Sequence, residues 1–218
     1  MNSFKGIHII TIKDKSYPNK LRNIYNLPIC LFYKGNINLA NKKIIAVVGC
    51  RDCSNYGARI AFELSYKLSK KGIIIISGGA RGIDTCAHKG ALAANMPTIE
   101  VLGNSLEYIY PPENKELEEK ILKAKGLIIS EYINGTKPSK ITFPERNRII
   151  SGLSDGVIVV EAKKESGSII TVDYALEQGK NVYAVPGNIT SKYSEGTNEL
   201  IKQGAKAVTK IEDILEEL

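Results

Sequence analysis

The chain has 218 residues, of which 43% are hydrophobic, and its excess of Lys and Arg over Asp and Glu gives a formal net charge of +7. These values predict one α/β domain, at most with a small appendage, and they favour polyanionic partners. No apolar run approaches the ~20 residues of a membrane helix, and residues 1–6 lack the apolar core of a signal peptide. We therefore expect a soluble, cytoplasmic protein without a membrane partner.

The N-terminal part of the chain predicts a small lead-in segment that packs on the core. Residues 7–12 and 29–33 are strand-like, with a short helix between them, and polar residues 36–43 form a joint to the rest. We expect this lead-in segment to span residues 1–43, followed by one core domain over 44–218. The two should form one compact unit.

The core begins with the stretch around which the chain is organised. Five apolar residues without alternation, at 44–48, predict a strand buried on both faces of a parallel sheet. Gly49, Cys50 and Arg51 follow, and Ser54 or Asn55 can cap a helix that begins near residue 56. A tight turn before a helix N-terminus offers backbone N–H groups to an anion, and arginine has a planar fork suited to phosphate. An ordinary turn with a surface arginine stays an open alternative.

Strands and helices then alternate to the end of the chain. Strands are predicted at residues 73–76, 98–103, 126–131, 156–161, 181–185 and 205–209. Helices are predicted at 85–95, 113–123, 143–153, 169–178, 199–203 and 211–218. This alternation predicts an α/β fold with a doubly wound, mostly parallel sheet and helices on both faces. In such sheets ligands bind at the carboxyl ends of the strands.

Cationic residues and glycines gather in the loops at that edge. The glycine-rich loops include Ser77–Gly82, Ser166-Gly167-Ser168 and Pro186-Gly187. The cations on or beside the edge are Arg51, Arg81, Lys137, Lys140, Arg146 and Arg148. A cationic groove with one aromatic ring, here Phe143, is typical of proteins that hold single-stranded nucleic acid. Two alternatives stay open. Phe143 can pack on Ile149 or Ile150, and Arg146 or Arg148 can pair with Glu145 or Glu161.

Other chemistries have weaker signals. The phosphate loop of nucleotide hydrolases and the G-x-G-x-x-G dinucleotide fingerprint are both absent from the sequence. Asp84 and His88 could act as an orienter and a base, although Asp84 also suits the first turn of a helix. Cys50 and Cys53 have C-x-x-C spacing at a helix N-terminus, but too few further ligands accompany them for a metal site. We predict no metal, no cofactor and no catalytic residue.

Several sequence blocks, in order, resemble the DNA processing protein A family, also called Smf. The resemblance spans residues 7–210, and its most specific block is Phe143–Ser154. The other matching segments are Val48–Arg51 with Ser54 and Tyr56-Gly57, Ser77–Asp84, Ala87-His88, Gly90–Leu92, Tyr110-Pro111 with Asn114, Ser130–Tyr132, Val160–Ala162, Ser166–Ser168, Val185–Gly187, Gly196–Asn198 and Gly204-Ala205.

The resemblance implies an extended Rossmann-like domain that binds single-stranded DNA and promotes loading of the RecA recombinase in natural transformation. It also implies a homodimer that needs neither metal nor nucleotide. Carried over by motif, Gly49, Cys50 and Arg51 would hold a phosphate. The remaining DNA- or phosphate-binding residues would be Arg81, Lys140, Phe143, Arg146, Asn147, Arg148, Ser166, Gly167, Ser168 and Gly187.

The sequence departs from the family pattern in two ways. Cys50 stands where the family usually has Ser or Thr, so we expect its backbone N–H to make the phosphate contact alone. We also expect a core without the helical N-terminal and winged-helix C-terminal domains of many relatives. The rival class is a phosphoribohydrolase of the lysine-decarboxylase-like type, but residues 161–168 depart from the Pro-Gly-Gly-x-Gly-Thr motif of those enzymes. A protein-interaction scaffold would leave Arg51 and the Phe143–Arg148 block unexplained.

Overall fold

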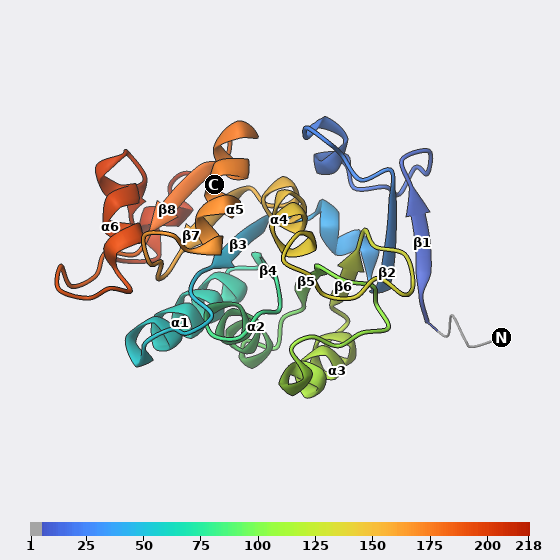
Figure 1. Cartoon of the computed structure of the whole chain (residues 1–218), viewed down its shortest axis with the longest axis horizontal. Helices are drawn as coiled ribbons and strands as arrows, with labels where there is room; N and C mark the ends of the chain where they lie inside the picture. Colours follow the sequence, from blue (N-terminus) through green and yellow to red (C-terminus); the bar gives the residue numbers. More distant parts are fainter. Residues whose placement is uncertain (1–5) are drawn as a thin grey trace.

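A nine-stranded sheet runs through the molecule, which a computed structural model describes for residues 6–218 (Figure 1). The strand order is β1-β2-β6-β5-β4-β3-β7-β8-β9. The strands are β1 (His8–Thr11), β2 (Cys30–Gly35), β3 (Ile44–Val48), β4 (Ile74–Ser77), β5 (Thr98–Leu102), β6 (Leu127–Ser130), β7 (Gly156–Val159), β8 (Asn181–Ala184) and β9 (Lys206–Ala207).

Strands β3 to β9 pair in parallel, and the two central neighbours of β3 come from distant parts of the chain. Ile45 is opposite Ile75 of β4 on one side and Gly156 of β7 on the other. The chain thus builds the sheet outward from β3 to β6, and then returns to place β7 on the other side of β3. In doubly wound sheets such a reversal creates a crevice at the carboxyl ends of the two strands. The predicted fold class is confirmed.

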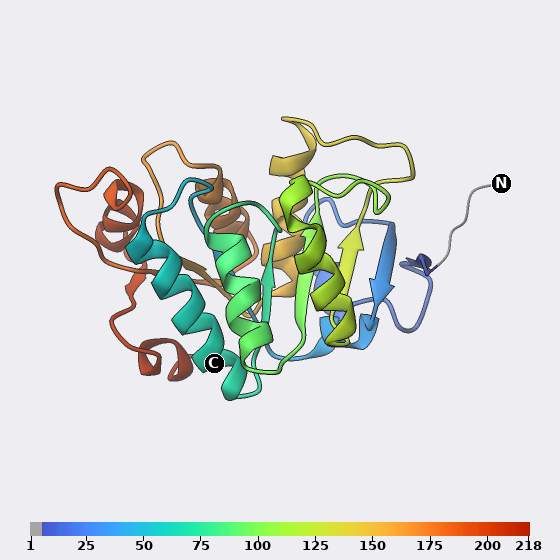
Figure 2. The same ribbon diagram turned by 90° about the horizontal axis from the view of Figure 1, so that it is seen from below.

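Helices cover both faces of the sheet. On one face lie α1 (Asn55–Lys70), α2 (Ile83–Ala93) and α3 (Lys115–Lys123), which are side by side in Figure 2. The other face carries α4 (Thr142–Leu153) and α5 (Gly167–Glu177), followed by α6 (Glu195–Lys202), and the chain ends with α7 (Glu212–Leu215). Short 3₁₀ helices occupy Asn19–Asn23, Ile37–Asn41 and Pro112–Asn114. Across residues 6–218, every helix is too short or too polar to traverse a lipid bilayer.

The strand β3 is buried on both faces, as its apolar run predicts. Ile44, Ala46 and Val48 pack in the core under α4 and α5, while Ile45 and Val47 pack in the core under α1 and α2. Because successive side chains of a strand point to opposite faces, only an uninterrupted apolar run can fill both cores.

The lead-in segment is part of the same sheet rather than a separate layer. β1 and β2 pair antiparallel, and β2 joins the parallel strands through antiparallel pairing with β6, where Phe32 is opposite Ser130. Leu21 of the first 3₁₀ helix is fully buried in the core that lies under α4. The first five residues of the predicted 1–43 segment lie outside the described residues, and the division at residue 43 stays a prediction.

Serine caps mark the starts of α1 and α5, although α5 begins at Gly167 and not at the predicted residue 169. The Ser54 hydroxyl accepts the N–H of Gly57 at 3.1 Å and caps α1, and Ser166 caps α5 in the same way. The prediction that α6 begins at Glu199 is wrong, since this helix begins at Glu195. The N–H of Gly196 donates to the carbonyl of Ala162 at 2.8 Å, and this tertiary contact fixes the first turn earlier than the sequence suggests.

Candidate functional site

A cavity of about 750 Å³ opens at the carboxyl edge of the sheet, between the loops that follow β3 and β7. This is the crevice expected where the strand order reverses. Its wall includes the turn Gly49–Asp52, the segment Pro138–Lys140, the first turns of α4, and the loop that leads into α5. The predicted site residues that line it are Gly49, Cys50, Arg51, Lys140, Phe143, Arg146, Asn147, Ser166, Gly167 and Ser168.

The turn after β3 is held rigidly by neighbouring backbone. A Cβ on Gly49 would lie 2.7 Å from the Ile83 side chain and 2.8 Å from the carbonyl of Glu161, so only glycine fits. The N–H of Cys50, expected to contact a phosphate, instead donates to that Glu161 carbonyl at 2.9 Å. The backbone N–H of Cys50 therefore already has a hydrogen-bond acceptor. The cationic group of this turn that remains exposed to a ligand is the side chain of Arg51.

The N-terminus of α1 already holds an anion of the protein itself. The carboxylate of Glu161 accepts the backbone N–H of Ser54 at 2.8 Å and its hydroxyl at 2.5 Å. A Cβ on Gly57 would collide with this carboxylate, so glycine makes room for it. The anion-binding role predicted for this helix start is thus filled by Glu161.

The N-terminus of α5 faces the cavity instead. Ser166, Gly167 and Ser168 all line it, and the two serine hydroxyls are 2.8 Å apart. Nothing lies within 4 Å of the position that a Cβ on Gly167 would occupy. The first N–H groups of a helix carry the positive end of its dipole, which favours phosphate or another anion here.

An arginine and two aromatic rings pack together at the cavity. The guanidinium carbon of Arg51 lies 5.0 Å from the centroid of the half-buried Phe143 ring. The Tyr110 ring lies 5.5 Å from the same centroid at an interplanar angle of 40°. Gly103 lies beneath Phe143, since a Cβ there would be 2.7 Å from the ring. Phe143 therefore packs on Tyr110 and Gly103, and its ring contributes to the cavity wall.

Arg146 lines the cavity but is a buried structural cation. Its guanidinium donates to the carbonyl of Gly78 at 2.6 Å and also to the carbonyl of Val101, at the ends of β4 and β5. Burial lowers the pKa of Arg146 to about 10, which still leaves it charged at neutral pH. Asn147 is equally enclosed, and its amide donates to the carbonyl of Gly167 at 3.3 Å, which ties α4 to the start of α5.

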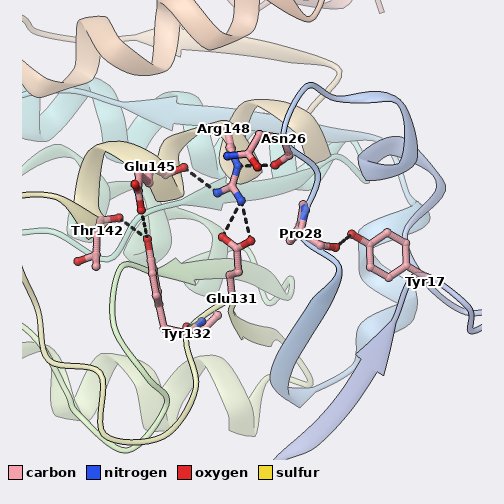
Figure 3. Close-up of polar contacts among 9 residues, drawn as sticks. Tyr17, Asn26, Pro28, Glu131, Tyr132, Thr142, Glu145 and Arg148 are labelled. Atoms are coloured by element: carbon pink, nitrogen blue, oxygen red, sulfur yellow. Dashed lines mark hydrogen bonds and ion pairs between the residues drawn. The ribbon is translucent and has the colours of Figure 1, made fainter.

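Arg148, which the family resemblance assigns to DNA binding, is not among the residues that line the cavity. Its guanidinium donates to both oxygens of Glu131, at 2.6 and 2.7 Å, and to the carbonyls of Glu145 and Asn26 (Figure 3). Since one helical turn has 3.6 residues, Arg148 cannot share a side of α4 with Arg146. It fastens the lead-in segment to α4, and its partner is neither of the acids that the sequence suggested.

Two further predicted residues also lie away from the cavity. The exposed side chain of Arg81 forms an ion pair with Glu113, before α3. Gly187 exchanges two hydrogen bonds of 3.1 Å with the side chain of Asn198 on α6. Both residues are at the carboxyl edge, but loops of different lengths carry them away from the crevice between β3 and β7.

Several residues that line the cavity were not predicted to bind a ligand, and Tyr110 and Lys163 are the two with the most evident chemistry. Tyr110 and Lys163 both line the cavity, and Lys163 also lies 3.6 Å from Asp52. Lys163 stands between a predicted strand end and a predicted helix cap, a position that could have marked it as an edge cation. Nothing in the local pattern around Tyr110 indicates that its ring reaches Phe143.

The titratable groups named as candidates for catalysis or metal binding are buried or half-buried, and their contacts are structural. His88 is fully buried, its Nδ1 lies 2.9 Å from the Thr98 hydroxyl, and burial lowers its pKa to about 3. Asp84 accepts the N–H of Ala80 at 3.3 Å, and burial raises the pKa of its carboxyl. Burial likewise raises the pKa of the Cys53 thiol to about 11, which favours the protonated thiol.

Comparison with known proteins identifies relatives of the whole chain. Residues 8–218 match the model of the DNA recombination-mediator protein A family. The chain is 46% identical to the DNA processing protein DprA of Bacillus subtilis, over 98% of this chain and 72% of that protein. It is 45% identical to the protein Smf of Escherichia coli, over 97% of this chain and 56% of that protein.

Solved structures give the same result. The structure of DNA processing protein A from Streptococcus pneumoniae superposes with a TM-score of 0.93 at 45% sequence identity. The match covers 99% of this chain and 75% of that one. DNA processing protein A from Helicobacter pylori, solved for its single-stranded DNA binding mode, has a TM-score of 0.85 at 32% identity, over 95% of this chain and 94% of that one. A molybdenum cofactor binding protein from Rippkaea orientalis, with 21% identity and a TM-score of 0.57 over 80% of this chain and 94% of that one, shares the fold.

Proposed function

The chain belongs to the DNA recombination-mediator protein A family, as its sequence blocks suggested, and on this premise we propose that it binds single-stranded DNA in the cavity. The observation that carries the proposal is the group of Arg51, Phe143 and Tyr110 beside the N-terminus of α5. A cation, an aromatic ring and a set of helix N–H groups are elements with which proteins hold a single strand. The single-stranded DNA binding of the Helicobacter pylori relative supports it.

In the proposed complex, phosphates contact three parts of the cavity. Arg51 supplies a bidentate donor, Lys140 supplies a second charge, and Ser166–Ser168 supply hydroxyls and backbone N–H groups. A base stacks on Phe143. Arg146 and Asn147 keep the wall in place through bonds to backbone carbonyls and do not bind DNA directly.

We further propose that binding, rather than catalysis, is the role of this site. The acids that line the cavity are Asp52, Asp84 and Glu165; the Asp52 carboxylate lies 3.6 Å from the Lys163 ammonium, and Asp84 accepts the N–H of Ala80. A catalytic base needs a free, aligned acceptor near the reacting atom. Loading of the RecA recombinase, a homodimer and a cytoplasmic location are the functional setting that the family resemblance implies, and we include them in the proposal.

Fluorescence anisotropy with labelled oligo-dT and a matching duplex tests the DNA proposal. Wild type should prefer the single strand, and the logarithm of its affinity should fall with the logarithm of salt concentration by about 0.7 per phosphate contacted. Phe143→Ala should cost roughly 1–3 kcal/mol of binding free energy. Arg51→Ala should weaken binding, whereas Arg81→Ala, which removes an exposed arginine outside the cavity, should leave it nearly unchanged.

The two arginine variants decide between a specific site and a diffuse positive surface. If Arg51→Ala and Arg81→Ala weaken binding equally, the cavity is not the DNA site. If wild type does not bind oligo-dT even at low salt, the DNA proposal fails as a whole.

A further inference from the structure

The outer side of α1 carries two stacked aromatic rings outside the cavity. The Phe62 and Tyr66 rings have centroids 6.5 Å apart and an interplanar angle of 8°. Their side chains are 38% and 36% exposed, although burying aromatic surface is favourable. The Lys70 ammonium lies 5.5 Å from the centroid of the Tyr66 ring. A cation and two parallel rings thus face solvent on one helix.

These residues form a continuous stripe with Arg59, which we call the α1 stripe. Its members, Arg59, Phe62, Tyr66 and Lys70, are spaced three or four residues apart and so lie on one side of the helix. The helix rises about 16 Å between the first and the last of them. The opposite side of α1 packs on the sheet and on α2 (Figure 2).

The charge around the α1 stripe is mostly positive. Four exposed cations lie on or beside it, at Arg59, Lys67, Lys70 and Lys71, against one exposed acid, Glu63. Within residues 6–218 these cations have no acid within ion-pair distance. Two copies of such a surface would repel each other, whereas a polyanion would be attracted.

The helix that carries the α1 stripe begins close in sequence to the proposed DNA site. α1 starts at Asn55, four residues after Arg51 of the cavity, and Tyr56 in its first turn is 41% exposed. A strand that leaves the cavity past Arg51 therefore meets the first turn of α1 next.

We propose that the α1 stripe is a second segment of the single-stranded DNA path, in which bases stack on Phe62 and Tyr66 and phosphates contact Arg59 and Lys70. This inference rests on the proposed function. Stacking on an aromatic face requires unpaired bases, so the stripe selects single strands over duplex. It also makes affinity depend on DNA length, because a short strand fills the cavity without reaching α1.

The test compares oligo-dT of about 6 nucleotides, near the lower end of common single-strand site sizes, with oligo-dT of about 20 nucleotides, which exceeds them. The double variant Phe62→Ala/Tyr66→Ala should bind the short strand as wild type does and the long strand at least about fivefold more weakly. A Phe62→Leu/Tyr66→Leu variant keeps apolar bulk and should show the same loss. Lys70→Gln should reduce the salt slope for the long strand by about 0.7. The matched control is Lys123→Gln, which removes an exposed lysine in the last turn of α3 and should leave the salt slope unchanged.

The outcomes separate this inference from the proposed function. If wild type binds both strands and the ring variants keep the wild-type affinity for the long strand, the proposal for the α1 stripe is wrong and the cavity proposal stands. Failure of wild type to bind either strand overturns the proposed function itself. If the ring variants change the oligomeric state in sedimentation but not DNA affinity, the stripe is a protein interface and the inference is wrong.

Discussion

Glu100→Gln is expected to raise the free energy of unfolding at alkaline pH. Glu100 lies on β5, is fully buried, and neither of its carboxyl oxygens has a hydrogen-bond partner among the described residues. Burial, reinforced by the nearby Glu118, raises the pKa of Glu100 well above its usual value. The folded protein tolerates this carboxyl only in its protonated form. The free energy of unfolding is therefore highest below the pKa of Glu100 in the unfolded chain, and it decreases as pH rises to the pKa in the folded chain.

The magnitude follows from the group that shares this environment. Burial raises the pKa of Glu118 from 4.5 to about 7, and a rise of this size corresponds to about 3 kcal/mol once the group is ionised. Arg146 is close enough to lower the pKa of Glu100, but Asp84 competes for the same charge. Because Gln cannot ionise, Glu100→Gln should be more stable than wild type near pH 9, by an amount comparable to the ionisation cost of Glu118. The difference should vanish below about pH 4, where Glu100 is protonated in both the folded and the unfolded chain.

Urea unfolding at several pH values measures this difference directly. The comparison requires equal denaturant slopes for the two proteins, and Glu119→Gln, an exposed neighbour of Glu118 on α3, controls for net charge. The competing view is that Glu100 is the anion that compensates the buried Arg146. In that case Glu100→Gln would be less stable than wild type, with a deficit that grows as pH rises, and our reasoning would be refuted.

Three other substitutions test the packing described above. Arg148→Ala should cost about 3 kcal/mol of stability in urea, because it leaves the carboxylate of Glu131 unpaired, while the affinity for a short oligo-dT should not change. Ser54→Ala should lower stability by about 1–2 kcal/mol in thermal unfolding, since it removes the cap of α1 and a bond to Glu161; an unchanged midpoint would contradict the capping role. Gly90→Ala should lower stability by roughly 1–3 kcal/mol, because a Cβ there meets the backbone of α1, and a neutral result would show that the two helices can separate freely.

The parallel part of the fold could be predicted because its hydrophobic pattern is unambiguous. The apolar run of β3 and the Ser54 cap fix a buried strand and the helix after it. The direction of β2 could not be predicted, since an apolar segment such as Cys30–Gly35 reads the same in either direction. Only its pairing with β6 makes the segment an antiparallel extension of the sheet.

The candidate site was predictable as an edge but not as a set of contacts. The rule that ligands bind at strand ends brings Arg51 and Phe143 together, and the structure places them 5.0 Å apart. The same rule cannot separate Arg146 from Arg148, because arginine is usually exposed and only the tertiary structure supplies the carbonyls and the carboxylate that bury these two. Nor could it show that the N–H of Cys50 already has a partner.

The strand order has a consequence for how the chain folds during synthesis. The lead-in strands leave the ribosome first, yet β2 finds its partner only when β6 has been made, and β3 stays without one neighbour until β7 follows. A two-stranded hairpin is at best marginally stable alone, and contacts between distant residues form slowly. The exposed edges of β2 and β3 therefore wait for most of the chain, so this protein should depend more on chaperones while it is being translated than when it refolds at full length.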